Sequence, residues 1–221
     1  MCGDWPQCNM PTSGLCGVIL AAGQSSRMGR DKALLPWPKT DTPTPGPHST
    51  LLSSSIRSLS DRCDLVLVVA GANADSLRPV IYGCAADLVV NPAPERGQFS
   101  SLQVGLQEVL NRGRDSAMVT LVDRPPLLPE TLAALVNAFL SRAHGIWTIV
   151  PEFQGAHGHP ILIGREMIEA LLRAPVTSTA REVEHSHLQR IAYVDTLDPM
   201  VTANLDTPEA YSSVQSLQSA R

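Results

Sequence analysis

The sequence has no excess of positive charge, which limits the partners that the protein can have. It contains 17 Lys and Arg residues against 21 Asp and Glu, and its formal net charge is −4 at pH 7. Nucleic acids and anionic membranes attract basic proteins through their phosphates. We therefore expect neither nucleic acid nor a membrane as a partner, and any cations that bind phosphate must be concentrated locally.

Long apolar runs are missing as well. No run approaches the roughly 18–20 apolar residues that a membrane-spanning helix needs. Residues 1–14 lack the basic start and the apolar centre of a secretory signal. We therefore expect a cytoplasmic protein.

Cysteine is scarce and follows no pattern. The five cysteines form no Cys-x-x-Cys pair and their number is odd, so neither a zinc motif nor a disulfide framework is indicated. We expect reduced structural thiols, with Cys2 and Cys8 left as an alternative metal site.

The length and the hydrophobic content favour one folded domain. A chain of 221 residues with 43% hydrophobic residues can bury a full core. We expect a flexible arm over residues 1–14, a single domain over 15–214 and a polar tail over 215–221. A proline-rich stretch over 38–48 predicts an exposed loop within the domain.

Short apolar runs alternate with segments of helical periodicity along this domain. Strands are expected over 15–21, 65–70, 87–90, 118–122, 146–150 and 161–163, and helices over 49–59, 75–82, 100–110, 132–139 and 165–173. The alternation predicts a three-layer α/β, Rossmann-like fold with a mixed, mostly parallel sheet. Ligands bind beyond the carboxyl ends of such strands, where Gly71, Asn91 and Asp123 are expected to share one rim.

The loop that follows the first strand is rich in small and cationic residues. Gly23 begins it, and Ser25, Arg27, Arg30 and Lys32 follow within ten residues. Backbone amides at a glycine turn and nearby cations together suit a polyphosphate. The loop has neither the Gly-Lys-Ser/Thr of a Walker motif nor the third glycine of the dinucleotide fingerprint. The alternative is a solvated strand-to-helix loop.

The order of residues in this loop resembles the signature of a known enzyme family. Leu20 to Lys32 reads Leu-Ala-Ala-Gly-x-Ser-x-Arg-Met-Gly-x-x-Lys, which is similar to the molybdenum-cofactor nucleotidyltransferases (MobA-like NTP transferases), and most of all to their cytidylyltransferase branch. The resemblance implies a nucleotidyltransferase fold, Lys32 as the catalytic lysine and Arg27 as the clamp on the β- and γ-phosphates. The nucleoside would lie on the backbone of Leu20, Ala21, Ala22 and Gly23.

Two aspartates are candidate magnesium ligands. Asp123 ends an apolar strand, and Mg²⁺ takes carboxylate oxygens, usually one or two from protein. By resemblance, Asp206 in the run Asp206-Thr207-Pro208 is the second ligand. Each aspartate has an alternative role as a cap of the helix that follows it.

Asn91, Gly97, Ser100 and Ser101 match another family stretch and are expected to bind the nucleotide. Gly71 is expected to do so from the same rim. The alternative is that Ser100 and Ser101 cap a helix, which is compatible with anion binding at the helix start.

Arg124 and His159 are candidates for acceptor binding. Relatives usually have Asp-Gln-Pro where this chain has Asp123-Arg124-Pro125, so Arg124 could meet a second phosphate. His159 belongs to a Gly-His-Pro run that matches the substrate-side segment of the family. Residues 177–182 depart from the family pattern, which loosens the assignment of the acceptor. A zinc site built from His157, His159, His185 and His187 is the alternative for these histidines.

The resemblance implies Mg²⁺-dependent transfer of a nucleoside monophosphate onto a phosphorylated acceptor such as molybdopterin cofactor, with release of pyrophosphate. Guanylyltransferases tend to have Leu-Ala-Gly-Gly where this chain has Leu20-Ala21-Ala22-Gly23, which favours CTP, with GTP as the other option. It also admits a chaperone or a target molybdoenzyme as a protein partner. The alternatives are transfer to a sugar or alcohol phosphate, and a non-catalytic nucleotide-binding regulator.

Overall fold

The structure is a computed structural model that describes residues 12–23, 31–38 and 48–219. Eight strands form one mixed sheet in the order β3-β2-β1-β4-β7-β5-β6, and β8 pairs with β5. The strands are β1 (Thr12–Leu20), β2 (Cys63–Ala70), β3 (Asp87–Val90), β4 (Ser116–Leu121), β5 (Thr148–Phe153), β6 (Ala156–His157), β7 (Ile161–Gly164) and β8 (Ile191–Asp195).

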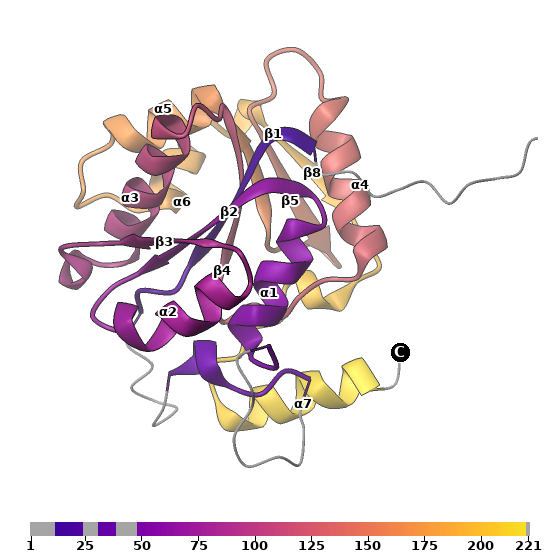
Figure 1. Cartoon of the computed structure of the whole chain (residues 1–221). Coiled ribbons are helices and arrows are strands. Elements are labelled where there is room, and N and C mark those ends of the chain that lie inside the picture. Colours follow the sequence, from indigo (N-terminus) through magenta and orange to yellow (C-terminus); the bar gives the residue numbers. More distant parts are fainter. Residues whose placement is uncertain (1–11, 24–30, 39–47, 220–221) are drawn as a thin grey trace, which may run out of the picture.

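Helices cover both faces of the sheet (Figure 1). The first group is α1 (Leu51–Ser60), α2 (Ala74–Gly83), α4 (Pro129–Leu140) and α7 (Pro208–Ser219), and the second is α3 (Gln98–Asn111), α5 (Arg165–Arg173) and α6 (Ala180–His185). Each group packs its buried side chains into a separate hydrophobic core. Strand β1 shows why there are two cores: Leu15 and Ile19 join the first, whereas Cys16 and Val18 join the second. Alternate side chains of a strand point to opposite faces, so the predicted three-layer α/β fold is confirmed.

Most of the sheet that positions the site is parallel. Strands β1, β2, β3 and β4 run in one direction, with β1 paired to both β2 and β4. Strand β7 reverses the direction, because it is antiparallel to both β4 and β5. The carboxyl ends of β1, β2, β3 and β4 therefore meet at one edge, as predicted.

Several predicted boundaries need correction. Strand β1 starts at Thr12, which pairs with Cys63, so residues 12–14 belong to the sheet rather than to a flexible arm. Strand β5 starts at Thr148, because Ile146 still donates to the carbonyl of Ala143 in a turn. The polar residues 215–219 continue α7. The proline-rich loop lies outside the described residues over 39–47.

The helix signals in the sequence act as expected at two places. Thr50 caps α1, since its hydroxyl accepts from the amide of Ser53 while the Ser53 hydroxyl accepts from the amide of Thr50. Helix α5 covers the predicted residues 165–173.

No helix in the described part of the chain is long and apolar enough to cross a membrane.

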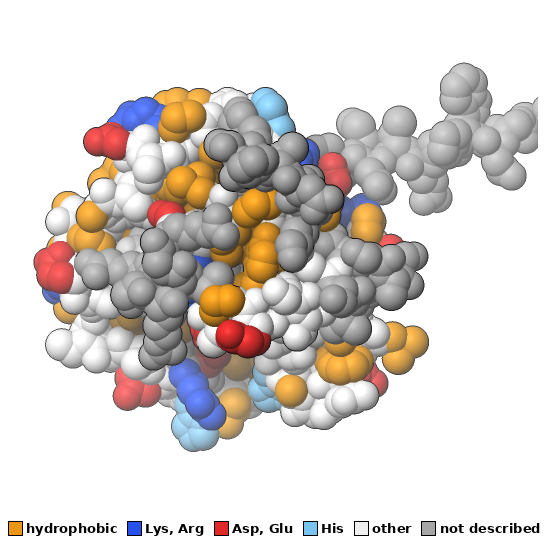
Figure 2. Space-filling model, turned by 90° about the horizontal axis from the view of Figure 1, so that it is seen from below, with side chains coloured by type: hydrophobic (Ala, Val, Ile, Leu, Met, Phe, Trp, Pro, Cys, Tyr) orange, Lys and Arg blue, Asp and Glu red, His pale blue; other side chains and the backbone are white. Residues whose placement is uncertain are grey.

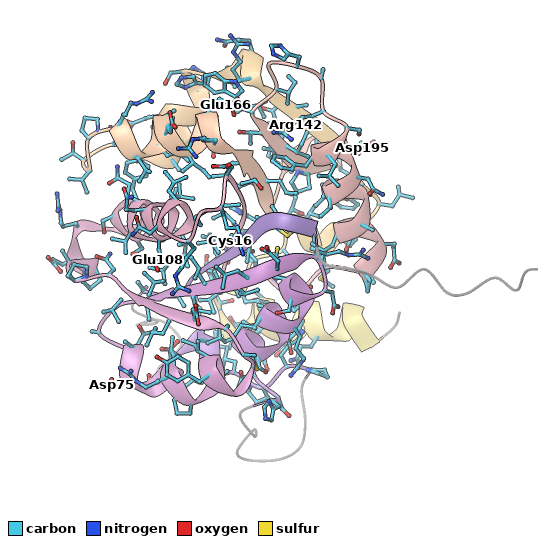
Figure 3. All side chains as sticks on the ribbon, turned by 45° about the horizontal axis from the view of Figure 1, so that its top comes forward. Cys16, Asp75, Glu108, Arg142, Glu166 and Asp195 are labelled. Atoms are coloured by element: carbon cyan, nitrogen blue, oxygen red, sulfur yellow. The ribbon has the colours of Figure 1, made fainter. Side chains whose placement is uncertain are left out.

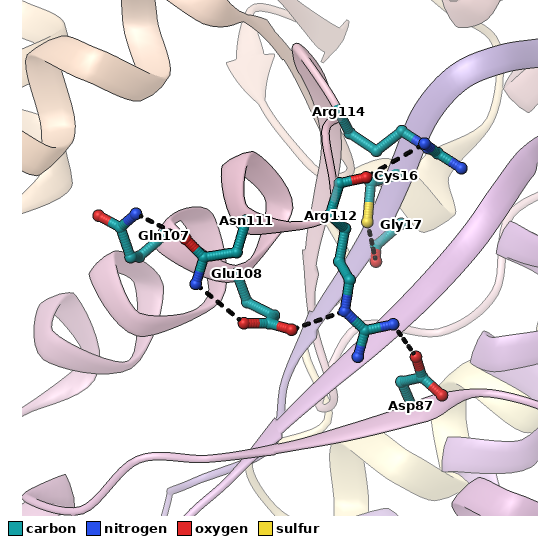
Figure 4. A network of polar contacts seen from close by, with 8 residues as sticks. All are labelled: Cys16, Gly17, Asp87, Gln107, Glu108, Asn111, Arg112 and Arg114. Atoms are coloured by element: carbon teal, nitrogen blue, oxygen red, sulfur yellow. Dashed lines mark hydrogen bonds and ion pairs between the residues drawn. The ribbon is translucent and has the colours of Figure 1, made fainter.

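Polar contacts also tie the amino end of the sheet together (Figure 4). Arg112, which follows α3, donates to Glu108 at 2.7 Å and to Asp87 at the start of β3 at 2.6 Å. Cys16 lies in the interior beside this network (Figure 3), and burial raises the pKa of its thiol to about 12. Cys16, Cys63 and Cys84 are all free thiols, which agrees with the prediction for these three.

On the face shown in Figure 2, acidic and basic side chains are interspersed.

Candidate active site

A cavity of about 760 Å³ opens at the carboxyl edge of the parallel strands. Its walls come from the ends of β1 and β4, the turn after β2 and the start of α3. Of the predicted nucleotide-binding residues in the described part of the chain, those on the wall are Leu20, Ala22, Gly23, Lys32, Gly97 and Ser101, together with the candidate metal ligand Asp123. Ser25 and Arg27 lie outside the described residues.

Asn73, which the sequence analysis did not select, ties the two ends of the phosphate-loop segment together. Its side-chain Nδ2 donates to the carbonyl of Ala21 at 2.9 Å and to Asp31 Oδ2 at 2.7 Å. Its Oδ1 accepts from the amide of Gly71 at 3.1 Å. The amide of Ala21 continues the β1–β2 ladder by donating to Val69. Position 73, three residues beyond the end of β2, was the available signal, but only the fold brings it to Asp31.

Gly71 lies where backbone and loop come closest. A Cβ atom at this position would be 2.9 Å from Pro94 Cβ and 3.2 Å from the carbonyl oxygen of Ala22. Real Cβ atoms do not approach this closely, so the residue must be glycine for the two walls of the cavity to pack.

Lys32 lies between the two candidate metal ligands. Its Nζ is 2.6 Å from Asp206 Oδ1 and 3.5 Å from Asp123 Oδ2. The Lys32 side chain is 13% exposed, so solvent screens these contacts less than it would on an open surface. The fold thus brings together three residues from the segments after β1, after β4 and before α7.

Asp123 does not cap the helix that follows it. Helix α4 begins at Pro129 with Leu128 before it, and Leu128 makes no side-chain cap hydrogen bond. At the start of α7, the hydroxyl of Thr207 accepts from the amide of Ala210. The capping alternative is therefore wrong for Asp123, which instead lies on the cavity wall.

The donor set at this edge suits magnesium. Asp123 Oδ1 is buried without a hydrogen-bond partner among the described residues. Hard oxygen donors of this kind are the ligands that Mg²⁺ prefers, and phosphates usually complete its shell. Within residues 12–23, 31–38 and 48–219, no three His, Cys, Asp or Glu side chains cluster as a metal site. The histidines of the zinc alternative have other contacts: His157 meets Glu152 and stacks on Tyr193, and His187 contacts the carbonyl of Val183.

Asn91, Ser100 and Ser101 form a buried unit beside the cavity. Asn91 Nδ2 donates to both serine hydroxyls at 2.9 Å, and Asn91 Oδ1 accepts from the amide of Ala93. The serines do not cap α3, because the helix already begins at Gln98 after Gly97. Of the three, Ser101 reaches the cavity wall.

A second cavity of about 540 Å³ adjoins the first and shares Leu20, Gly97, Gln98 and Leu121 with it. The segment over 177–181 and His159 line this second cavity, so the predicted acceptor residues other than Arg124 come together here. Burial, and then the charge of Arg124, lower the pKa of His159 to about 4. His159 is therefore a neutral hydrogen-bonding group at pH 7.

Arg124 does not line either of these two cavities, which corrects the expectation that it faces a substrate phosphate. Its Nη1 donates to the carbonyl oxygens of Thr202 and Ala203, at 3.1 and 2.9 Å. The guanidinium is directed to the backbone of the chain segment that carries Asp206.

A mixed α/β sheet with two carboxylates and a lysine at its carboxyl edge is compatible with a nucleotidyltransferase, and the family comparison shows this class. The sequence model of the MobA-like NTP transferase domain matches residues 17–191, and the chain belongs to this family. The family resemblance and the enzyme class expected from the sequence are thereby confirmed.

Individual relatives agree with this assignment. The chain is 26% identical over 197 residues to a molybdenum cofactor cytidylyltransferase of Escherichia coli, covering 84% of this chain and 93% of the relative. It is 35% identical over 123 residues to a probable molybdenum cofactor guanylyltransferase of Mycobacterium avium, covering 56% of each chain. The crystal structure of Rv0371c from Mycobacterium tuberculosis superposes with a TM-score of 0.72 at 25% identity, covering 92% of this chain and 99% of that one.

Proposed function

We propose that this enzyme transfers CMP from CTP to a phosphorylated acceptor of the molybdopterin type, depends on Mg²⁺ and releases pyrophosphate. The observation that carries the proposal is the position of the Lys32 ammonium between Asp123 and Asp206 at the mouth of the nucleotide-sized cavity. Relatives of both nucleotide specificities exist, so the choice of CTP rests on the Leu20-Ala21-Ala22-Gly23 sequence.

The chemistry asked of the protein is mainly positioning and charge stabilisation. An oxygen of the acceptor phosphate attacks the α-phosphorus of CTP, and the bond from that phosphorus to the bridging oxygen of the β-phosphate breaks. The electron pair leaves with pyrophosphate. The acceptor phosphate is already ionised at neutral pH, so no strong general base is needed.

Each residue has a role in the proposed reaction, which its position supports for the described residues and which the family resemblance alone supports for Arg27 and Ser25. Asp123 and Asp206 would hold Mg²⁺, which when bound neutralises charge on the nucleotide phosphates. Lys32 stabilises the charge that develops on the α-phosphoryl oxygens. Arg27 and Ser25, with the backbone at Gly23, grip the leaving pyrophosphate. The acceptor occupies the second cavity, where neutral His159 offers a hydrogen bond rather than a charge.

The cellular setting follows from the reaction. The acceptor would be met in the cytoplasm, and the nucleotide-linked product passes to a target molybdoenzyme or to its chaperone.

The decisive experiment compares the melting temperature with each of the four NTPs, with and without Mg²⁺, and then measures pyrophosphate release with a phosphorylated pterin. A ligand that binds only the folded state raises the melting temperature by mass action. We expect a Mg²⁺-dependent rise with CTP and CTP-dependent pyrophosphate release. A rise with GTP alone would replace the base assignment, and release only with sugar or alcohol phosphates would replace the acceptor. A rise with an NTP but no pyrophosphate release with any acceptor would favour the non-catalytic regulator, and no rise with any NTP would overturn nucleotide binding itself.

A further inference from the structure

The chain segment that carries Asp206 has no regular secondary structure of its own. It runs over residues 202–206, between a short 3-10 turn (Pro199–Val201) and α7. A segment of this kind is not held by a helical or sheet ladder, so its position depends on contacts with neighbouring elements. The position of the Asp206 carboxylate is therefore set by whatever holds the segment.

Three contacts attach the segment to the end of β4. Arg124 Nη1 donates to Thr202 and Ala203, at 3.1 and 2.9 Å. The amide of Leu205 donates to the carbonyl of Asp123 at 2.9 Å. Asp123 and Arg124 are consecutive in the chain. One candidate metal ligand, Asp123, is therefore directly bonded to the residue that holds the segment of the other, Asp206.

A fourth contact acts on the carboxylate itself. Asn204 Nδ2 donates to Asp206 Oδ2 at 2.6 Å, while Asp206 Oδ1 meets Lys32. The side-chain amide of Asn204 thereby fixes the rotation of the Asp206 carboxylate about its Cβ–Cγ bond. As a result, Oδ1 is the oxygen that contacts Lys32.

We propose that Arg124 and Asn204 are positioning residues that hold the Asp206 carboxylate on the same side of the site as Asp123, where Lys32 contacts both. The inference rests on the proposed function, because it takes both aspartates as metal ligands. Arg124 positions the segment through its backbone, and Asn204 orients the carboxylate through its side chain.

The chemistry of arginine fits this task. A guanidinium is always charged and planar, so one nitrogen can serve two carbonyl oxygens with charge-assisted hydrogen bonds. A glutamine at position 124 would offer neutral and weaker donors from a shorter side chain. Arg124 therefore attaches the segment of Asp206 more firmly than a glutamine at this position would.

Arg142 supplies a matched control. It follows α4 (Figure 3), it is partly buried, and its guanidinium donates to the carbonyls of Phe139 and Ile146, at 2.6 and 3.1 Å. It lines neither of the two cavities of the candidate site. The substitutions Arg124→Gln and Arg142→Gln thus remove the same kind of contact, but only the first removes it beside Asp206.

The test measures Mn²⁺ bound to the protein with CTP present, from the electron paramagnetic resonance signal of free Mn²⁺ and against a CTP-only reference that gives the Mn²⁺ bound by the nucleotide itself. We expect Arg124→Gln and Asn204→Ala to raise the Kd for Mn²⁺ about tenfold or more, and Arg142→Gln to leave it nearly unchanged, whatever each does to the melting temperature. In pyrophosphate release, the Mg²⁺ concentration for half-maximal rate should rise for the first two variants, while kcat at saturating Mg²⁺ recovers to within about threefold.

The outcomes separate this inference from the proposed function. Wild-type Mn²⁺ affinity in both Arg124→Gln and Asn204→Ala would overturn the positioning role. An equal loss of Mn²⁺ affinity in Arg142→Gln would also overturn it, because the effect would then be one of general stability. A wild-type protein that binds no Mn²⁺ with CTP would instead overturn the metal site of the proposed function. Asn204→Ala keeps the test valid if Arg124→Gln does not fold.

Discussion

Lys32 owes its position to two carboxylates that come from distant parts of the chain. Its Nζ contacts Asp206, 174 residues away, at 2.6 Å and Asp123 at 3.5 Å. Two carboxylates this close to one cavity repel each other unless a cation lies between them. The ammonium stabilises the pair in the free protein, and in the proposed function it then acts on the α-phosphate.

This arrangement predicts the effect of Lys32→Met. The variant keeps the length of the side chain but removes its charge, so the rate of nucleotidyl transfer at saturating CTP should fall about a hundredfold or more. The affinity for Mn²⁺ should stay the same or increase, because two carboxylates are left without a competing ammonium. Steady-state pyrophosphate release and Mn²⁺ titration measure the two effects.

Arg78→Met is the control for this substitution. Arg78 forms an exposed ion pair with Asp75 on α2, a kind of contact that contributes little, so its loss should change neither quantity. If Lys32→Met kept the wild-type rate, the catalytic role of Lys32 would be wrong.

Some residues of the site could be selected from the sequence alone, and others could not. Lys32 and Asp123 stood out because each follows an apolar strand in a recognisable pattern. Asn73 and Asn204 did not, since a lone asparagine in a loop carries no periodic or motif signal. Their roles depend on which distant atoms they meet.

At the scale of elements, the turn after β2 and the loop before α3 pack against each other to form one wall of the nucleotide cavity. The contact depends on Gly71, which faces Pro94 on one side and the carbonyl of Ala22 on the other. The shape of this wall therefore depends on the close packing of the two segments at Gly71.

Gly71→Ala should separate these segments. The new methyl group would force Pro94 or the backbone of Ala22 to move, which costs on the order of 1–3 kcal/mol of unfolding free energy. CTP should bind more weakly as well, because the displaced segments line its cavity. Urea unfolding and calorimetric titration with CTP measure the two effects.

Gly83→Ala, near the end of α2, is the matched substitution, since its Cβ would meet only His48 at an ordinary 3.5 Å. It should be neutral or slightly stabilising. Equal losses in the two variants would mean that close packing at Gly71 is not the cause.

Elements were predictable from the sequence where periodicity was strong and less so at their ends. Helix α5 and strand β3 have the predicted bounds. Strand β1 gains its first residues through pairing with β2, and β5 loses its expected first residues to a turn. For β1 a pairing partner about fifty residues away decided the boundary, whereas for β5 a turn bond between Ile146 and Ala143 decided it.

For the whole molecule, the buried histidine beside the second cavity makes stability depend on pH. The pKa of His159 is about 4 in the folded protein, mainly through burial, against 6.5 for an ordinary histidine. The folded state therefore takes up its proton less readily than the unfolded state. The contribution of His159 is complete above pH 6.5 and is lost as the pH falls toward 4.

This difference predicts that the titration of His159 lowers the free energy of unfolding by about 2 to 3 kcal/mol between neutral pH and about pH 4.5. His159→Gln does not titrate, so its free energy of unfolding should fall less over the same interval. Urea unfolding of both proteins across this range tests the prediction, and comparison of the two removes the shared contribution of the carboxylates. Parallel curves for the two proteins would show that His159 does not titrate differently on folding.

The sequence alone determined the alternation of strands and helices, the edge at which ligands bind and the family, because these follow from local hydrophobic patterns and from contiguous motifs. The tertiary structure decided what Arg124 does and which side chains hold the ends of the loop and of the segment before α7. Those contacts join residues such as Arg124 and Thr202, 78 positions apart, and form only when the sheet and its loops are packed. A hydrogen bond between distant residues depends on ångström-scale placement by the whole fold, and no local pattern encodes it.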